Sequence, residues 1–213
     1  VTTLLDDPTL GQFDQLPLYA IGKPKGKAIG NVAWGKTIVS LHQNEKERTL
    51  QFSSFDSTTS EGLDRWSSKT LPSSISIGPI VWEDALWGAD RDSLWRWETP
   101  ATTPTRWSWP SGFKPHALAG VAQRDGIGKS GVVAIGDSGV VAFAAADSPP
   151  RLIATPLTGR MNSELREQIW RIVVADFLRV GHDQLFAVGS YGTTFIVDLK
   201  NGELLQPPRT YAR

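Results

Sequence analysis

The chain has 213 residues, of which 40% are hydrophobic and none is cysteine. This length suffices for a substantial core, and the lack of cysteine excludes disulfides, thiolate catalysis and cysteine-ligated zinc. Its 22 basic and 22 acidic side chains balance, so no strong electrostatic field favours nucleic acid. The apolar stretches are much shorter than the roughly 20 residues of a transmembrane helix. We therefore expect neither nucleic-acid binding nor membrane insertion.

The first part of the chain predicts short strands separated by turns. Residues 14–28 contain a strand-like run that ends in glycine, Leu18–Gly22, and we interpret them as the remnant of a repeated unit. Residues 29–78 hold three strand-like runs around a polar turn, followed by a serine- and threonine-rich segment at 56–68. The pattern predicts a unit of antiparallel strands with a linker at its end.

Tryptophan marks the next unit, residues 79–113. The run Ala85–Gly88 and the run Ser93–Trp97 flank a short turn, which predicts two paired strands. A proline- and threonine-rich segment then leads to a further strand that carries Trp107 and Trp109. We predict that this strand forms a hairpin with the one before it.

The last two units, residues 114–160 and 171–208, repeat a single pattern. Their aligned positions are Val121 with Val174, Gly128 with Gly181, Gly136 with Gly189, and Gly139 with Gly192. In both units a strand-like run, a tight glycine turn and a second strand-like run follow one another. Between the units, residues 162–170 show helical spacing of their apolar side chains and predict one short helix.

The repeated units indicate a fold class. Four short antiparallel strands joined by tight turns make one blade of a β-propeller, and blades of about 40 to 50 residues are usual. The sequence therefore predicts an all-β chain, with residues 1–213 forming a single β-propeller domain of about four to five blades, complete or incomplete. The repeat does not determine the function, because such scaffolds carry lectins, enzymes and interaction platforms.

The repeats resemble a known family, most clearly at residues 121–143 and 174–196. The second stretch is similar to the FG-GAP or VCBS repeat, with the rough pattern D-x-D-G-D-G-x-x-D-L-x-V-G-x-x-G. Positions that match in register are Asp176, Gly181 and Leu185, and those that match after a one-residue shift are Asp183, Val188, Gly189 and Gly192. The earlier copy keeps Asp125, Gly126, Gly128, Gly136 and Gly139. The resemblance implies a β-propeller.

The same resemblance makes Asp176 and Asp183 candidate calcium ligands, because the acidic turn of that family often binds calcium. Calcium requires several oxygen ligands in close proximity, and here Leu178 and Val180 stand at inner acidic positions of the pattern. We favour a turn in which the two carboxylates accept hydrogen bonds from the backbone. We expect no metal and no cofactor.

Two features suggest catalysis without establishing it. The segment Gly136–Gly139 is similar to the nucleophile loop of chymotrypsin-like proteases, but no histidine lies in the sequence context of that family. The carboxylates of Asp84, Asp90 and Asp92 flank a turn, and paired carboxylates serve glycoside hydrolysis. Carboxylates at turns are more commonly solvated groups that stabilise the turn. We therefore predict that the chain is not an enzyme.

The predicted hairpin carries four of the nine tryptophans. Trp95 and Trp97 alternate on one strand and Trp107 and Trp109 on the next, so the four indoles could share one face. We favour a structural role between neighbouring blades, since large aromatic side chains are usually buried. The alternative is a surface that binds a sugar or a partner protein. Its candidate residues are Trp95, Arg96, Trp97, Arg106, Trp107, Trp109 and Tyr191.

Three functional hypotheses follow. The first is a non-catalytic interaction module or scaffold subunit of a larger assembly, with another protein chain as its partner. The second is a lectin-like propeller that binds carbohydrate on its aromatic turns. The third is a small glycosidase-type propeller enzyme whose carboxylates converge in space. The tryptophan pairs occur in one unit only, whereas lectin propellers tend to repeat their site, so we favour the first hypothesis.

Overall fold

The computed structural model describes residues 27–43, 47–56, 65–122, 130–154, 170–190 and 192–210. In chain order the strands are β1 (Lys27–Trp34), β2 (Thr37–Gln43), β3 (Arg48–Asp56), β4 (Arg65–Pro72), β5 (Ile77–Trp82), β6 (Ala85–Ala89), β7 (Ser93–Trp97), β8 (Thr105–Ser108), β9 (Pro115–Val121), β10 (Gly131–Gly136), β11 (Val141–Ala145), β12 (Arg151–Ala154), β13 (Trp170–Ala175), β14 (Gln184–Gly189), β15 (Thr193–Asp198) and β16 (Leu204–Thr210). A 3-10 turn, η2 (Asp137–Gly139), joins β10 to β11. The prediction of an all-β chain is confirmed for the described residues.

The strands form four antiparallel sheets of four strands, and in each sheet the strands are neighbours in sequence order. We name them sheet A (β1 to β4), sheet B (β5 to β8), sheet C (β9 to β12) and sheet D (β13 to β16). Sheet A spans residues 27–72, sheet B 77–108, sheet C 115–154 and sheet D 170–210.

Three predictions differ from the structure or lie beyond it. Part of the predicted linker is a strand: β4 pairs with β3, with Arg65 opposite Asp56 at one end and Pro72 opposite Thr49 at the other. Residues 162–169 of the predicted helix lie outside the described residues. Its last residue, Trp170, is the first residue of β13 instead. The predicted remnant at 14–28 also lies outside them, except for its last two residues, which begin β1.

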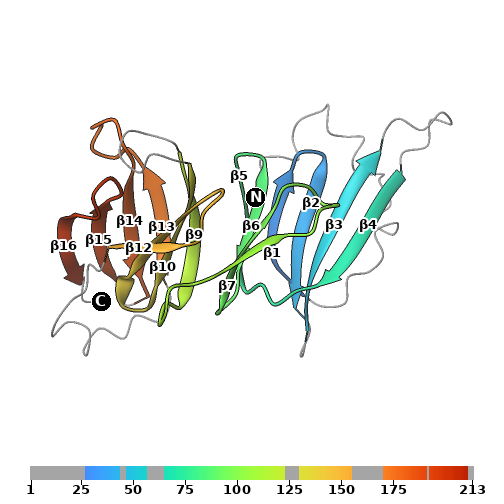
Figure 1. Ribbon diagram of the computed structural model, residues 1–213, viewed down its shortest axis with the longest axis horizontal. Coiled ribbons are helices and arrows are strands. Elements are labelled where there is room, and N and C mark those ends of the chain that lie inside the picture. The colour runs from blue at the N-terminus through green and yellow to red at the C-terminus, as the bar shows by residue number, and fades with distance from the viewer. Residues whose placement is uncertain are drawn as a thin grey trace.

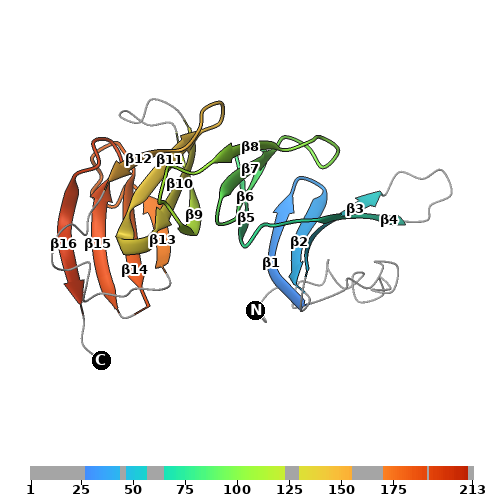
Figure 2. The same ribbon diagram turned by 60° about the horizontal axis from the view of Figure 1, so that its bottom comes forward.

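The four sheets lie in a row, with sheets A and D at opposite ends (Figures 1 and 2). The first strands of successive sheets are side by side: β1 lies against β5, β5 against β9, and β9 against β13. One apolar cluster fills each of the three interfaces between neighbouring sheets. Sheets B and C are therefore covered on both faces, which explains why every residue of β10 is buried and why its sequence is continuously apolar.

Local turn geometry positions the interface between sheets A and B. The β5–β6 hairpin turns through Glu83 and Asp84, whose φ angles are 46° and 60°. Two-residue hairpin loops favour positive φ because this matches the twist of the strands. The backbone carbonyl of Asp84 then accepts a hydrogen bond of 2.7 Å from the indole nitrogen of Trp34 in sheet A. The turn thus contributes one hydrogen bond between sheets A and B.

At the interface between sheets B and C, the indole ring of Trp82 on β5 lies against Gly120 of β9. A Cβ atom at Gly120 would overlap the indole ring. We predict that Gly120→Ala destabilises the chain by about 2 kcal/mol, because overpacking forces the ring or the strand to move. Urea unfolding followed by tryptophan fluorescence measures this. The cost should fall when Trp82→Leu is added, and an equal cost in both backgrounds would contradict the close contact.

Candidate functional site

The tryptophan hairpin exists, but its four indoles do not share one face. The register pairs Trp95 with Arg106 and Leu94 with Trp107. Directly paired residues lie on the same face of a sheet, so Trp95 and Trp107 lie on opposite faces. Trp109 lies beyond the end of β8. The expectation of a single aromatic face is therefore wrong, because a shift of one residue in register moves a side chain to the other face.

On the face toward sheet A, Trp95 stacks on Trp97 with 6.1 Å between ring centroids and an interplanar angle of 16°. The guanidinium of Arg106 lies over the ring of Trp95, 4.9 Å from its centroid. Its Nε donates a hydrogen bond of 2.8 Å to Ser93 Oγ. Trp97 is buried in the cluster between sheets A and B.

On the face toward sheet C, Trp107 stacks on Trp87, with 6.1 Å between ring centroids. Arg96 lies over the same Trp87 ring and forms a 2.9 Å ion pair with Glu98. Trp109 is buried in the same cluster, but its ring is not part of the stack of Trp87 and Trp107. Most of this indole surface is therefore used between sheets. Binding by the predicted residues stays a prediction, and Tyr191 lies outside the described residues.

Asp90 is a structural anion at the end of β6. Its buried carboxylate accepts four hydrogen bonds: from the backbone N–H of Asp92 (2.8 Å) and of Ser93 (2.7 Å), from Ser74 Oγ (2.5 Å) and from Trp95 Nε1 (2.9 Å). Burial alone would raise the pKa of Asp90, but these hydrogen bonds outweigh it and lower the pKa. We expected a solvated turn carboxylate here, and the burial of Asp90 corrects that.

The two candidate calcium ligands lie in the loop between β13 and β14. The carboxylate of Asp176 accepts hydrogen bonds of 2.9 Å from the backbone N–H of Val180 and from that of Gly181. The carboxylate of Asp183 accepts one of 3.3 Å from Ala122 of the neighbouring sheet. These are side-chain bonds to backbone, the arrangement that the sequence favoured. Within the described ranges, no cluster of three or more metal-ligating side chains occurs.

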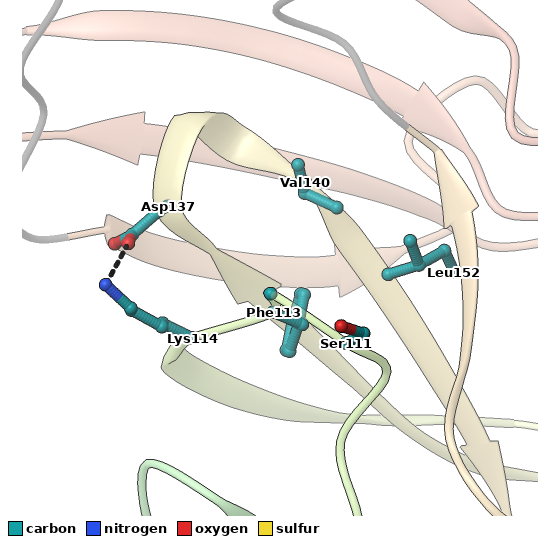
Figure 3. A pocket seen from close by; sticks show the side chains of 7 residues that line it. Ser111, Phe113, Lys114, Asp137, Val140 and Leu152 are labelled. Atoms are coloured by element: carbon teal, nitrogen blue, oxygen red, sulfur yellow. Dashed lines mark ion pairs between the residues drawn. The ribbon is translucent and has the colours of Figure 1, made fainter.

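A pocket of about 180 Å³ lies beside η2. Figure 3 shows Lys114 and Asp137 at one end of it and Val140 and Leu152 at the other. The lining residues are Ser111, Gly112, Phe113, Lys114, Asp137, Val140 and Leu152. Asp137 is 3.9 Å from Lys114 Nζ and 2.5 Å from His116 Nε2. The lining includes one carboxylate, whereas glycoside hydrolysis uses two.

His116 and Asp137 are a pair that sequence reasoning missed. They lie on different elements, β9 and η2, which meet because the start of β9 pairs with the end of β10. The Gly136–Gly139 segment forms the turn between two repeat strands, as predicted, with Asp137 at the first position of η2. No signal in the local sequence around Asp137 reveals its histidine partner, because the two residues are brought together by strand pairing.

Sheet D has one face against sheet C, and among the described residues no sheet lies over its other face. The register places Val173 opposite Phe186, and Phe186 opposite Ile196. Val188 lies two residues after Phe186 on β14 and shares its face. Phe177 packs edge-on against Phe186, with ring centroids 6.4 Å apart. We call these five residues the outer face of sheet D.

The repeat shows that the apolar pattern of this face has a counterpart in sheet C. Its counterpart in sheet C is the face that packs on sheet D, where Val133, Ile135 and Phe143 align with Phe186, Val188 and Ile196. Those sheet C side chains are completely buried or nearly so. In sheet D the aligned Phe186, Val188 and Ile196 are half-buried, and beside them Val173 is 54% exposed and Phe177 is 44% exposed. The same apolar pattern is fully buried in sheet C and only half-buried in sheet D.

Comparisons with known proteins place the chain in no family: no family model matches it, and no curated protein matches it. In the part of the chain that the structure describes, no helix has the length and apolar character to cross a bilayer.

Proposed function

We propose that this chain is a non-catalytic interaction module of β-propeller type, a scaffold subunit that binds another protein chain through the outer face of sheet D. Four-stranded meanders arranged with their first strands side by side support the propeller, since blades have this order. The resemblance of residues 174–196 to the FG-GAP or VCBS repeat supports it as well.

The observation that carries the proposal is the contrast between sheets C and D. Burial of apolar surface contributes about 25 cal/mol per Å², so the exposed surface of Val173 and Phe177 leaves that stabilisation unused. Contiguous exposed apolar patches on soluble proteins mark interaction sites. Val173 and Phe177 are the most accessible parts of this patch.

The alternative functions receive less support from the same residues. A lectin would stack sugars on exposed aromatic rings, but Trp97 and Trp109 are buried and Arg106 covers Trp95. A glycosidase would place two carboxylates at one cavity. Asp90 instead anchors a turn through four hydrogen bonds.

The proposal is tested by capture from the native host with a matched pair of variants. Val173→Arg alters the outer face of sheet D, and Ile38→Arg alters a side chain of similar exposure, 43%, on sheet A. We expect one protein to co-purify in stoichiometric amount with the wild-type chain and with Ile38→Arg. Its recovery with Val173→Arg should fall about tenfold or more, because the new charge would be buried without a partner. Equal recovery with all three chains would contradict the proposal.

A further inference from the structure

We infer that the pocket beside η2 binds a free α-amino acid with an aliphatic side chain, such as leucine. The pocket shares no residue with the outer face of sheet D, so this inference is independent of the proposed function. Its two ends differ in chemistry: Lys114 and Asp137 lie at one end, and Val140 and Leu152 lie at the other (Figure 3). An aliphatic amino acid carries an ammonium, a carboxylate and an apolar side chain, which match these features.

Close packing of the backbone builds the charged end of the pocket. The backbone N–H of Asp137 donates a hydrogen bond of 3.2 Å to the carbonyl of Lys114, which holds the start of η2 against the segment before β9. Gly136 permits this approach, because a Cβ atom there would lie 2.8 Å from both the Lys114 carbonyl oxygen and the Phe113 ring. The backbone therefore places the lysine and the aspartate side by side.

The side chains of Lys114 and Asp137 retain hydrogen-bonding capacity at the pocket. Asp137 Oδ1 is 2.5 Å from His116 Nε2, whereas Asp137 Oδ2 is 3.9 Å from Lys114 Nζ, beyond hydrogen-bond distance. Oδ2 can therefore accept a hydrogen bond from a bound molecule, and Nζ can donate one. An α-amino acid carries its ammonium and its carboxylate on one carbon atom and can reach both groups at once. Hydrogen bonds between charged groups are the strong ones.

The opposite end of the pocket suits an aliphatic side chain. Phe113 is buried, Val140 is half-buried and Leu152 is 45% exposed. An apolar group bound there would remove apolar surface of Leu152 from water, which is favourable. The volume of about 180 Å³ is smaller than the roughly 300 to 1,000 Å³ of pockets for drug-sized ligands, and it therefore favours a small molecule.

The balance of charge favours a zwitterion over an acid or an amine. A simple carboxylic acid would meet the Lys114 ammonium but would bring its negative charge close to Asp137. A simple amine would meet the Asp137 carboxylate but would approach Lys114, and like charges at short distance repel each other. The end of a peptide chain carries only one of the two charges next to its side chain. The same argument therefore favours a free amino acid over the terminus of a partner protein.

The charged and apolar ends of the pocket occur in only one of the two aligned units. In the repeat, Ser190 stands at the position of Asp137 and Thr193 at the position of Val140. The repeated turn thus requires neither an acidic nor an aliphatic side chain at these positions. The features that would recognise an amino acid are particular to sheet C.

Titration of the isotope-labelled chain with leucine, followed by two-dimensional NMR spectroscopy, tests the inference. We expect the backbone N–H signals of Gly112 and Val140 to shift with a Kd of about 1 mM, because the ligand is small and the side chains of Lys114 and Asp137 are half exposed. Three probes each lack one feature of leucine: glycine lacks the apolar side chain, isocaproate lacks the ammonium, and isoamylamine lacks the carboxylate. Each should bind about tenfold or more weakly than leucine.

Two lysine substitutions provide a matched pair. Lys114→Met removes the ammonium that would bind the ligand's carboxylate, and it should weaken leucine binding by about tenfold or more. Lys36→Met makes the same change at an exposed lysine between β1 and β2, and it should leave leucine binding unchanged. Circular dichroism confirms that both variants are folded.

Three results would overturn the inference. The first is an absence of shifts at Gly112 and Val140 up to about 20 mM leucine, well above the expected Kd. The second is binding of isocaproate or isoamylamine as tight as that of leucine, which would show that the two charges do not act together. The third is equal weakening by Lys114→Met and Lys36→Met. None of these results bears on the capture experiment, because the outer face of sheet D is not part of the pocket.

Discussion

Replacing Asp90 with alanine should lower the free energy of unfolding by about 4 kcal/mol. The carboxylate accepts four hydrogen bonds in a buried setting. Removing it leaves the backbone N–H groups of Asp92 and Ser93, the Ser74 hydroxyl and the Trp95 indole without their acceptor, and each buried donor without a partner costs about 1 to 3 kcal/mol. Urea unfolding followed by tryptophan fluorescence measures the loss.

Asp92→Ala is the matched control, because Asp92 is exposed and its backbone N–H is retained; its effect should stay within about 0.5 kcal/mol. The pH dependence gives an independent check. The pKa of Asp90 is lowered in the folded chain, so its stabilising contribution is complete above the unfolded pKa of about 4 and is lost as the pH falls below it. Asp90→Asn should flatten this loss. An Asp90→Ala variant as stable as Asp92→Ala would contradict the structural role.

Replacing Trp87 with alanine should cost about 4 kcal/mol, at the upper end of large-to-small substitutions in a core. Its indole is 1% exposed and stacks on Trp107 between sheets B and C. Alanine would leave a cavity that two rigid sheets cannot close. Thermal and urea unfolding, analysed together, measure the change.

Trp87→Phe separates packing from other effects of this substitution. Phenylalanine keeps much of the apolar volume and removes an indole N–H that has no hydrogen-bond partner, so the cost should be about half that of alanine or less. A loss below about 1 kcal/mol for Trp87→Ala would show that the ring does not lie in a packed interface.

Much of the fold could be predicted from the sequence because its signals are local. Alternation and continuous apolar runs revealed the strands, and Gly136 and Gly189 revealed the repeated turn. The strand β4 was missed because its serine-rich sequence has the composition of a linker. It becomes a strand through pairing along the whole of β3, which is a tertiary effect that overrides local propensity.

The candidate site was less predictable because it depends on register and on what covers each face. Trp95 and Trp107 were correctly predicted to lie on the two strands of a hairpin. The register of β7 and β8 places them on opposite faces of the sheet. Asp90 was identified as a turn residue, but its hydrogen bonds from Ser74 and Trp95 could not be foreseen. The apolar pattern of the outer face of sheet D was present in the repeat, whereas the exposure of Val173 and Phe177 could only be seen in three dimensions.

The most direct test of this account compares two single thiols in a chain that has no cysteine of its own. Val173→Cys places a thiol on the outer face of sheet D, and Val133→Cys places one on the buried face of sheet C. In dilute solution, we predict that the thiol at 173 reacts with a water-soluble disulfide reagent roughly a hundredfold faster than the thiol at 133, which is exposed only by local opening. Equally slow reaction at both positions would show that the outer face of sheet D is already covered, which would contradict its role as a binding surface.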